Sequence, residues 1–265
     1  MTGRGAAGGK WADLGPRISS ALAMAVIGIG AVWAGGPWFT SLAVLSAGLM
    51  VWELAAMFRP GPGAIALGAG AGLAVLAALL LPPALALPLL AVPALGGAVL
   101  VRRDPVIFAL YAMAAMLAAW GLVGFRADYG MVWLVWLLLV VIVTDIAGYF
   151  AGRLIGGPKF WPRVSPKKTW SGTVAGWIAA AAVGAVFWNF TTAGPDLPWI
   201  SAALSLASQM GDIAESAIKR RMGVKDSSRL IPGHGGLLDR FDGLLGAALM
   251  MLLVAQLVIV PEVRL

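Results

Sequence analysis

The sequence predicts an all-α, polytopic integral membrane protein with about nine transmembrane helices and a cytoplasmic amino terminus. Three observations support this fold class. Of 265 residues, 60% are hydrophobic and only 12% are charged, which leaves too few polar side chains to cover a water-soluble globule. Long apolar runs recur along nearly the whole chain, and lysine and arginine are concentrated in alternate connections between those runs.

The apolar runs are of the length that a membrane span requires. A hydrocarbon core about 30 Å thick needs roughly 20 apolar residues in a helix. Nine runs qualify: 18–34, 38–58, 63–81, 83–101, 106–125, 131–150, 172–190, 197–217 and 244–260. Prolines make the third and fourth runs the least regular. The first run follows basic residues, as a secretory signal does, but it is long for a signal and eight more runs follow, so we expect it to remain as a helix.

The basic residues indicate the orientation of the chain. With the amino terminus in the cytoplasm, seventeen of the nineteen lysines and arginines fall on the cytoplasmic side, and the exceptions are Arg126 and Arg264. This asymmetry explains the net charge of +7 without a nucleic-acid partner. We expect residues 1–125 to hold about five spans. Residues 126–265 would then form a C-terminal catalytic region with cytoplasmic loops 151–171 and 219–243.

The twelve acidic residues fall into two equal groups. Six lie near span ends or in loops and are expected to be solvated: Asp13, Glu53, Asp104, Asp128, Asp196 and Glu262. The other six fall in or beside the inner half of the last four spans: Asp145, Asp212, Glu215, Asp226, Asp239 and Asp242. A carboxylate at the centre of a membrane helix costs about 2.5 to 3.5 kcal/mol, so such groups are retained for function. This convergence predicts a functional site.

The spacing of these residues predicts a metal site. Asp212, Glu215, Ser216 and Lys219 are spaced i, i+3, i+4 and i+7 and therefore share one helix face. Asp239 and Asp242 are likewise three residues apart, if the last helix begins before them. Clusters of oxygen ligands suit Mg²⁺, whereas zinc is not expected in a chain with one histidine and no cysteine. The expected metal ligands are Asp145, Asp212, Asp239 and Asp242.

The loop at 151–171 has the composition of a phosphate-binding segment. It is interrupted by glycines and prolines and carries Ser165, Lys167, Lys168 and Thr169. Membrane topology alone explains the lysines about equally well, but the interleaved hydroxyl groups fit a cradle for a polyphosphate. A second basic cluster covers residues 219–225. Acids and bases together predict phosphoryl or nucleotidyl transfer from a soluble nucleotide onto a lipid phosphate.

The run "SAIKRRMGVKDSSRLIPGHGGLLDRFD" at 216–242 resembles the signature of the phosphatidate cytidylyltransferase, or CDP-diacylglycerol synthase, family. The positions in register are Ser216, Lys219, Arg220, Lys225, Asp226, Pro232, His234, Gly235, Gly236, Asp239, Arg240 and Asp242. "DIAGYFAGR" at 145–153, "SPKKTW" at 165–170 and "GDIAES" at 211–216 are similar to other family segments. The chain departs from the family at Ser171, which replaces a glutamate, at Ser227 and Ser228, which replace Phe-Gly, and at Gly243, which replaces a serine.

The resemblance implies a helical membrane enzyme, often a homodimer, that condenses CTP with phosphatidate to CDP-diacylglycerol and pyrophosphate. It implies Mg²⁺ with a second, monovalent cation such as K⁺, and it matches Asp212 and Asp239 to metal-binding aspartates. We expect a bacterial inner (plasma) membrane protein whose active site faces the cytoplasm. The expected catalytic residues are Asp212, Lys219, Lys225, Asp239 and Asp242. The expected cofactor- and substrate-binding residues are Ser165, Lys167, Lys168, Thr169, Ser216, Arg220, Asp226, His234 and Arg240.

Three questions stay open at the level of sequence. His234 has two equal interpretations: a hydrogen bond to a phosphate or ribose, or a structural hydrogen bond that pins the turn at 233–236. An ion-coupled transporter would also use membrane carboxylates, but it needs polar groups towards both sides of the membrane. A CTP-dependent kinase of polyprenol or dolichol would transfer the γ-phosphate instead of CMP.

Overall fold

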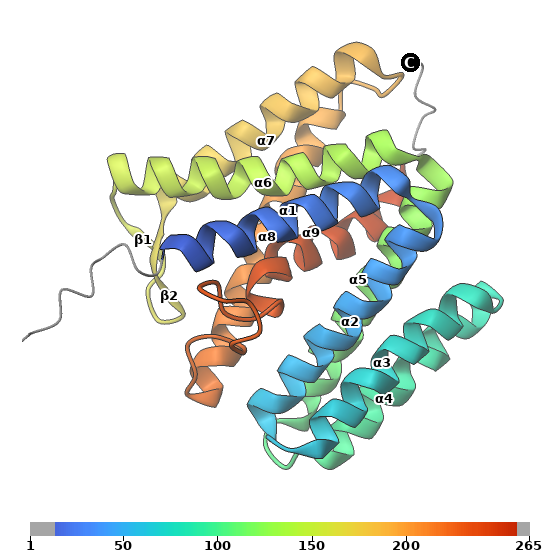
Figure 1. The fold of residues 1–265 in the computed structure, drawn as a ribbon. Coiled ribbons are helices and arrows are strands. Elements are labelled where there is room, and N and C mark those ends of the chain that lie inside the picture. Colours follow the sequence, from blue (N-terminus) through green and yellow to red (C-terminus); the bar gives the residue numbers. More distant parts are fainter. Residues whose placement is uncertain (1–13, 259–265) are drawn as a thin grey trace, which may run out of the picture.

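The computed structural model describes residues 14–258, which form nine α-helices, a short 3₁₀ helix and a two-stranded hairpin (Figure 1). The helices are α1 (Leu14–Ala34), α2 (Gly36–Phe58), α3 (Pro62–Leu80), α4 (Ala86–Leu100), α5 (Pro105–Tyr129), α6 (Met131–Leu154), α7 (Trp170–Phe190), α8 (Leu197–Met222) and α9 (Leu238–Leu257). Each predicted apolar run overlaps one of them. Asp13 and Glu262, which the sequence placed in solvated positions, and Arg264, one of the two exceptions to the basic asymmetry, lie outside the described residues.

Seven helical segments of the described chain are long and apolar enough to cross a membrane. They are α1, α2, α3, α5, α6, α7 and the segment Pro83–Leu100, in which the 3₁₀ helix η1 (Pro83–Leu85) leads into α4. The other two helices, α8 and α9, carry the acidic residues of the last two spans. The predicted helical, polytopic membrane class is therefore confirmed, whereas the count of nine spans and the orientation stay predictions.

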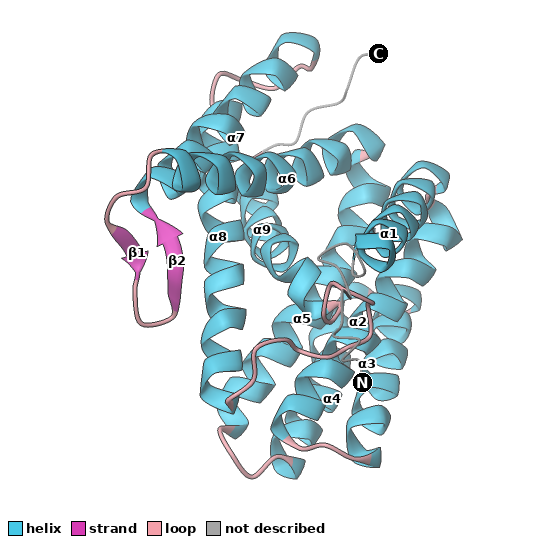
Figure 2. Cartoon of the chain, turned by 60° about the vertical axis from the view of Figure 1, so that its left-hand side comes forward, coloured by secondary structure: helices cyan, strands magenta, loops and turns pink. Residues whose placement is uncertain are grey.

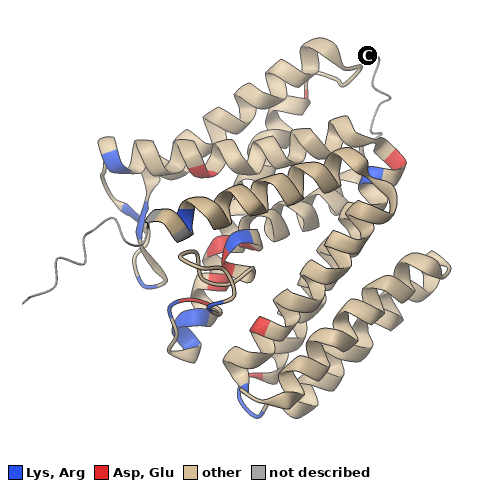
Figure 3. Ribbon diagram, viewed as in Figure 1, with Lys and Arg blue, Asp and Glu red and all other residues tan. Residues whose placement is uncertain are grey.

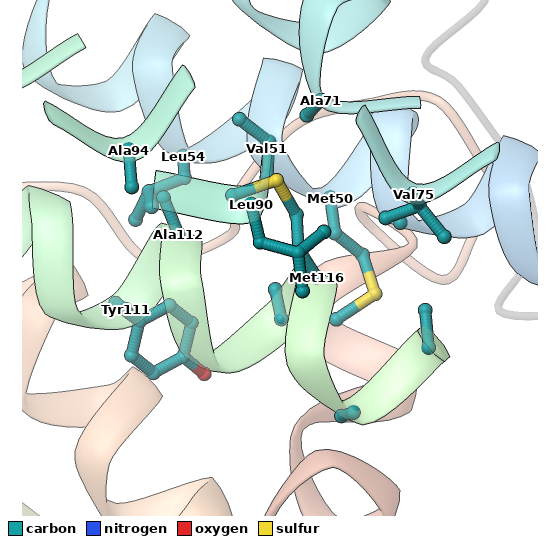
Figure 4. Packing of buried hydrophobic residues seen from close by; sticks show 14 of the residues in the cluster. Met50, Val51, Leu54, Ala71, Val75, Leu90, Ala94, Tyr111, Ala112 and Met116 are labelled. Atoms are coloured by element: carbon teal, nitrogen blue, oxygen red, sulfur yellow. The ribbon is translucent and has the colours of Figure 1, made fainter. Parts of the chain in front are cut away.

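The helices pack in two groups that meet along α5 and α9. Helices α2, α3, α4 and α5 lie side by side, and α6 to α9 form the second group (Figure 1). The first group encloses a cluster of small and aliphatic side chains, among them Val51, Leu90 and Met116 (Figure 4). The second encloses Trp133 and Trp136. Contacts of α9 with α5, and of α2 with α8 and α9, connect the two groups.

Glycines set the spacing between α8 and α9. A Cβ atom on Gly211 would lie 2.2 Å from the Asp242 carbonyl oxygen, and one on Gly246 would lie 2.2 Å from the Ala207 carbonyl oxygen. Real Cβ atoms do not approach other atoms so closely, so the two backbones can touch only because both positions lack a side chain. This contact places the first turns of α9 directly against the acidic face of α8.

The predicted loop at 151–171 contains a short hairpin that the sequence did not predict. Helix α6 continues to Leu154, and the chain then forms an antiparallel hairpin of β1 (Lys159–Trp161) and β2 (Ser165–Thr169). Figure 2 shows the hairpin in magenta, projecting from the helical bundle. The strands are too short to give an alternating pattern, which is why the glycines and prolines dominated the prediction. The other predicted loop is shorter than expected, since α8 ends at Met222 and α9 begins at Leu238.

Basic residues gather at one end of the helices. In Figure 3 they lie around the hairpin, the α8–α9 connection and the ends of α2 to α5 nearest to them. Arg126 lies at the opposite end, in the last turn of α5, where its guanidinium donates to the Val32 carbonyl oxygen at 2.8 and 3.0 Å. This distribution has the sidedness that the sequence predicts for a membrane protein.

Candidate active site

Three carboxylates from two helices form the centre of the candidate site. Oxygen atoms of Asp212 and Glu215 on α8 and of Asp242 on α9 all lie within 4.8 Å of one another. Glu215 is fully buried. The helical spacing puts the first two on one face of α8, and the glycine contact between the helices brings Asp242 against that face. Carboxylates this close repel one another, so the group, called here the three-carboxylate group, requires nearby cations.

Two lysines supply positive charge to this group. The Lys168 ammonium group, at the end of the hairpin, lies 2.5 Å from the Asp212 carboxylate. The Lys219 ammonium group, one turn after Glu215, lies 2.6 Å from that carboxylate and 2.6 Å from Asp239. The sequence predicted all these residues as site members except Glu215, which it placed in the acidic stripe without a role.

Asp239 lies beside the three-carboxylate group and has a different set of partners. Its Oδ1 atom pairs with Lys219. Its Oδ2 atom accepts hydrogen bonds from the backbone amides of Ser227 at 2.9 Å and Gly236 at 2.8 Å, and it lies 3.0 Å from the Ser227 hydroxyl oxygen. The first turn of α9 therefore ties the α8–α9 connection to Lys219. Asp239 organises the connection and faces the site through a single oxygen.

A cavity of about 410 Å³ opens between α6, α7, α8 and the hairpin. Its volume lies within the range of small-molecule sites, roughly 300 to 1,000 Å³. The residues that line it are Thr144, Asp145, Gly148, Tyr149, Gly152, Arg153, Lys167, Lys168, Thr169, Gly172, Thr173, Gln209 and Asp212. Asp145 and Asp212 thus lie on one cavity, together with Lys167 and Lys168 of strand β2. Asp145 is not within the three-carboxylate group as the structure places it.

The remaining predicted residues divide into buried and exposed positions. Thr169 is buried, and its hydroxyl accepts a hydrogen bond from the Gly172 amide at 3.2 Å, which caps α7. Ser216 donates to the Asp212 carboxylate at 3.2 Å. Ser165 begins β2, opposite Trp161. The other three are exposed at the end of α8 and in the connection after it: Arg220, Lys225 and Asp226.

His234 has structural contacts. Its Nδ1 atom lies 2.8 Å from the Ser20 hydroxyl of α1, and this hydroxyl also lies 2.9 Å from the Pro232 carbonyl oxygen. The His234 carbonyl oxygen accepts from the Arg240 guanidinium at 2.6 and 3.0 Å. These contacts correspond to the second interpretation of His234, in which a hydrogen bond pins the turn. They also give Arg240 a position on that turn.

Glu53 corrects a prediction. The sequence assigned it to the solvated acids because it lies near the end of a span, but the structure buries it fully. The α8–α9 connection folds over α2 and donates four hydrogen bonds to its carboxylate, from the hydroxyls of Ser227 and Ser228 and the amides of Leu237 and Leu238. These partners lie more than 170 residues from Glu53 along the sequence, so the local pattern around Glu53 contains no sign of them.

The structure describes two further groups to which the sequence assigned no role in the site. Tyr111 on α5 is only 8% exposed, and its hydroxyl has no hydrogen-bond partner among the described residues. Figure 4 shows this hydroxyl directed away from the aliphatic cluster.

Asp104, at the start of α5, accepts two hydrogen bonds from Arg221 at 2.5 and 2.6 Å. The Arg221 guanidinium holds the pKa of the Asp104 carboxyl below its ordinary value.

Comparison with known proteins places this arrangement in a family. Residues 15–258 match the cytidylyltransferase family. A phosphatidate cytidylyltransferase of Brucella suis biovar 1 (strain 1330) is 49% identical over 137 residues, 51% of this chain and 51% of that protein. Proteins of the same name from Staphylococcus saprophyticus and from Helicobacter pylori (strain ATCC 700392 / 26695) are 47% and 38% identical. These alignments cover 43% of this chain and 45% of the Staphylococcus protein, and 48% of both chains for the Helicobacter protein.

The alignments thus extend over about half the length of these relatives. The family match, by contrast, extends over nearly all of the described residues, including the helices that carry the three-carboxylate group. The chain belongs to the cytidylyltransferase family.

Proposed function

We propose that this chain is a phosphatidate cytidylyltransferase, which condenses CTP with phosphatidate to CDP-diacylglycerol and pyrophosphate. The observation that carries the proposal is the three-carboxylate group with Lys168 and Lys219 against it, next to a cavity that also holds Lys167. Nucleotidyl transfer needs cations around a polyphosphate and little covalent chemistry from the protein. The names of the aligned relatives agree with this chemistry.

The charges around the group fit a divalent cation. Asp239 and the three-carboxylate group together provide four carboxylates, and two lysines lie against them. The donors are all oxygen atoms, as Mg²⁺ prefers, and Asp212, Glu215 and Asp242 would hold it. Asp145 and Asp239 remain further ligand candidates, and we include a monovalent cation such as K⁺. Bound Mg²⁺ would neutralise charge on the triphosphate.

The chain's own residues would bind and orient the substrates. Lys167 and Lys168 would hold the phosphates of CTP on the side of the cavity, and Lys219 would bring positive charge from the side of α9. An oxygen of the phosphatidate phosphate would attack the α-phosphorus of CTP. One P–O bond forms there, the bond between the α-phosphorus and the bridging oxygen breaks, and pyrophosphate leaves with the bonding electrons. Phosphatidate is already anionic, so no general base is required.

The site's place in the bundle suits a reaction between a soluble and a lipid substrate. The basic end of the helices, with the hairpin and the α8–α9 connection, would face the cytoplasm of a bacterial cell at the inner membrane (Figure 3). CTP would then arrive from water and phosphatidate from the bilayer. We further propose a homodimer, to be tested by the mass of the purified protein in detergent.

Two buried polar groups in the deeper part of α8 have hydrogen-bond partners on α6. The buried hydroxyls of Ser201 and Ser205 are bound by α6, one through the Trp136 indole at 3.1 Å and the other through Thr144 at 2.8 Å. Such pairs hold membrane helices together. They account for these two polar groups without an ion route.

Labelled CTP tests the reaction. Purified protein is incubated with phosphatidate in mixed micelles, Mg²⁺, and CTP labelled at the α- or the γ-phosphorus. Cytidylyl transfer puts the α label in lipid and the γ label in pyrophosphate. Lipid labelled from the γ position would identify a lipid kinase instead, and the absence of label in lipid from either position would overturn the proposal.

A further inference from the structure

The buried carboxylate of Glu53 has no part in the proposed chemistry, yet four hydrogen-bond donors surround it. Its Oε1 atom accepts from the Ser228 hydroxyl at 2.6 Å and the Leu237 amide at 2.9 Å. Its Oε2 atom accepts from the Leu238 amide at 2.7 Å and the Ser227 hydroxyl at 3.2 Å. All four donors belong to the α8–α9 connection and the start of α9. A buried carboxylate is tolerated when donors surround it in this way.

Two of these bonds replace a missing helix cap. The residue before α9 is Leu237, which has no side-chain oxygen to accept from the first amides of the helix. The Glu53 carboxylate accepts from the amides of Leu237 and Leu238, at the end of the helix that carries partial positive charge. Helix α9 is therefore capped from α2, and its position depends on a residue of the N-terminal helices.

The other two bonds connect Glu53 to the site. Ser227 joins the two acids: its hydroxyl donates to Glu53 at 3.2 Å, and its backbone amide donates to Asp239 at 2.9 Å. Gly236 lies beside them, and a Cβ atom there would lie 2.0 Å from the Ser227 hydroxyl and 2.7 Å from Glu53. A side chain at position 236 would therefore displace Ser227 or Glu53. The chain of contacts continues from Asp239 to Lys219, and from Lys219 to Glu215.

We infer that Glu53 is a positioning residue for the catalytic site. It fixes the start of α9 and the α8–α9 connection, and through Ser227 and Asp239 it holds Lys219 against the three-carboxylate group. The effect of Glu53 on turnover rests on the proposed function, whereas its effect on the order of the connection does not. The hydroxyls of Ser227 and Ser228 are the two side-chain donors to the Glu53 carboxylate.

Hydrogen exchange tests the structural part without any assay of activity. We compare the full-length protein with Glu53→Gln and Ser228→Ala in detergent, following by mass spectrometry the peptides that cover residues 223–241. Loss of a charge-assisted bond predicts about tenfold faster exchange in Glu53→Gln and a smaller increase in Ser228→Ala. Leu54→Ala is the matched control, since Leu54 is the buried neighbour of Glu53 in the hydrophobic cluster. It should lower the unfolding temperature and leave this segment protected.

Kinetics test the functional part. In Glu53→Gln, the kcat for the formation of labelled lipid should fall by about tenfold or more at saturating CTP. The KM for phosphatidate should change little. Leu54→Ala should retain kcat per folded enzyme. Unchanged exchange and unchanged kcat in Glu53→Gln, with an active wild-type enzyme, would overturn the inference. An inactive wild type would overturn the proposed function instead, and the exchange result would still decide whether Glu53 orders the connection.

Discussion

The Lys168 ammonium group lies 2.5 Å from the Asp212 carboxylate and so joins the hairpin to helix α8. The same ammonium lies 3.3 Å from the Gln209 carbonyl oxygen, one turn earlier on α8. These two contacts hold the end of β2 over the cavity, next to the carboxylate that the sequence had matched to a metal ligand. A loop of basic residues is thereby given a fixed position relative to the acids.

Replacing Lys168 should therefore reduce turnover more than replacing a lysine outside the cavity, although both changes remove one positive charge. In Lys168→Met we expect kcat to fall by about 10²-fold or more, since the side chain would stabilise charge on the leaving pyrophosphate. Lys159→Met is the matched control, because Lys159 is exposed on the partner strand and does not line the cavity. Initial rates of lipid labelling decide the matter. An equal fall in kcat in both variants would show that the reaction needs positive charge on the hairpin but not the position of Lys168.

Glu215 should contribute to cation binding. In Glu215→Gln the group loses one of its three carboxylates, and we expect the Mg²⁺ concentration for half-maximal rate to rise by about tenfold or more. Asp196→Asn, an exposed acid at the other end of α8, provides the comparison. Titration of Mg²⁺ at saturating substrates gives both values. An unchanged half-saturating concentration in Glu215→Gln would remove this residue from the ligand set.

The contact between α8 and α9 should be sensitive to a single methyl group. In Gly211→Ala the new Cβ atom would press against the Asp242 carbonyl oxygen, and we expect a loss of about 1 to 3 kcal/mol in stability together with reduced activity. Gly70→Ala in α3 has open space around its Cβ position and should be neutral or slightly stabilising. Thermal unfolding in detergent measures both. Equal unfolding temperatures for the two variants would contradict close packing at Gly211.

The sequence located the helices and predicted that Asp212, Glu215 and Asp242 lie close together, because apolar runs, helical spacing and the cost of charge in a membrane are local signals. Apolar runs located each helix, and helical spacing predicted the shared face of Asp212, Glu215 and Lys219. The sequence-based prediction failed where contacts between distant parts of the chain determine the surroundings of a residue. The burial of Glu53 depends on a connection far along the chain, and the different partners of Asp239 and Asp242 depend on how α9 meets α8. The hairpin was missed because its strands are three and five residues long.

The ion pair between Asp104 and Arg221 predicts a pH dependence. The hydrogen bonds from Arg221 lower the pKa of Asp104 from its ordinary value of 3.8, so the ionised carboxylate favours the folded state. The contribution is present above that ordinary value and is lost as the pH falls through the lower pKa of the folded state. It should be small and should weaken in salt, because the pair is on the surface.

Asp104→Asn isolates this effect, since asparagine tolerates the left-handed backbone at this position. The unfolding temperatures of wild type and variant should differ near neutral pH and converge in acid. Curves that remain parallel down to a pH below the ordinary carboxyl pKa would contradict the ion pair.

The most direct measurement is the transfer of α-labelled CMP to phosphatidate by the wild type, Asp212→Asn and Asp242→Asn in lipid vesicles at saturating Mg²⁺. The two aspartates come from different helices and meet in one group, so the central claim requires both. We predict labelled CDP-diacylglycerol from the wild type and a rate lower by about 10²-fold or more in each variant. Wild-type rates in either variant would contradict the claim that the three-carboxylate group is the catalytic centre.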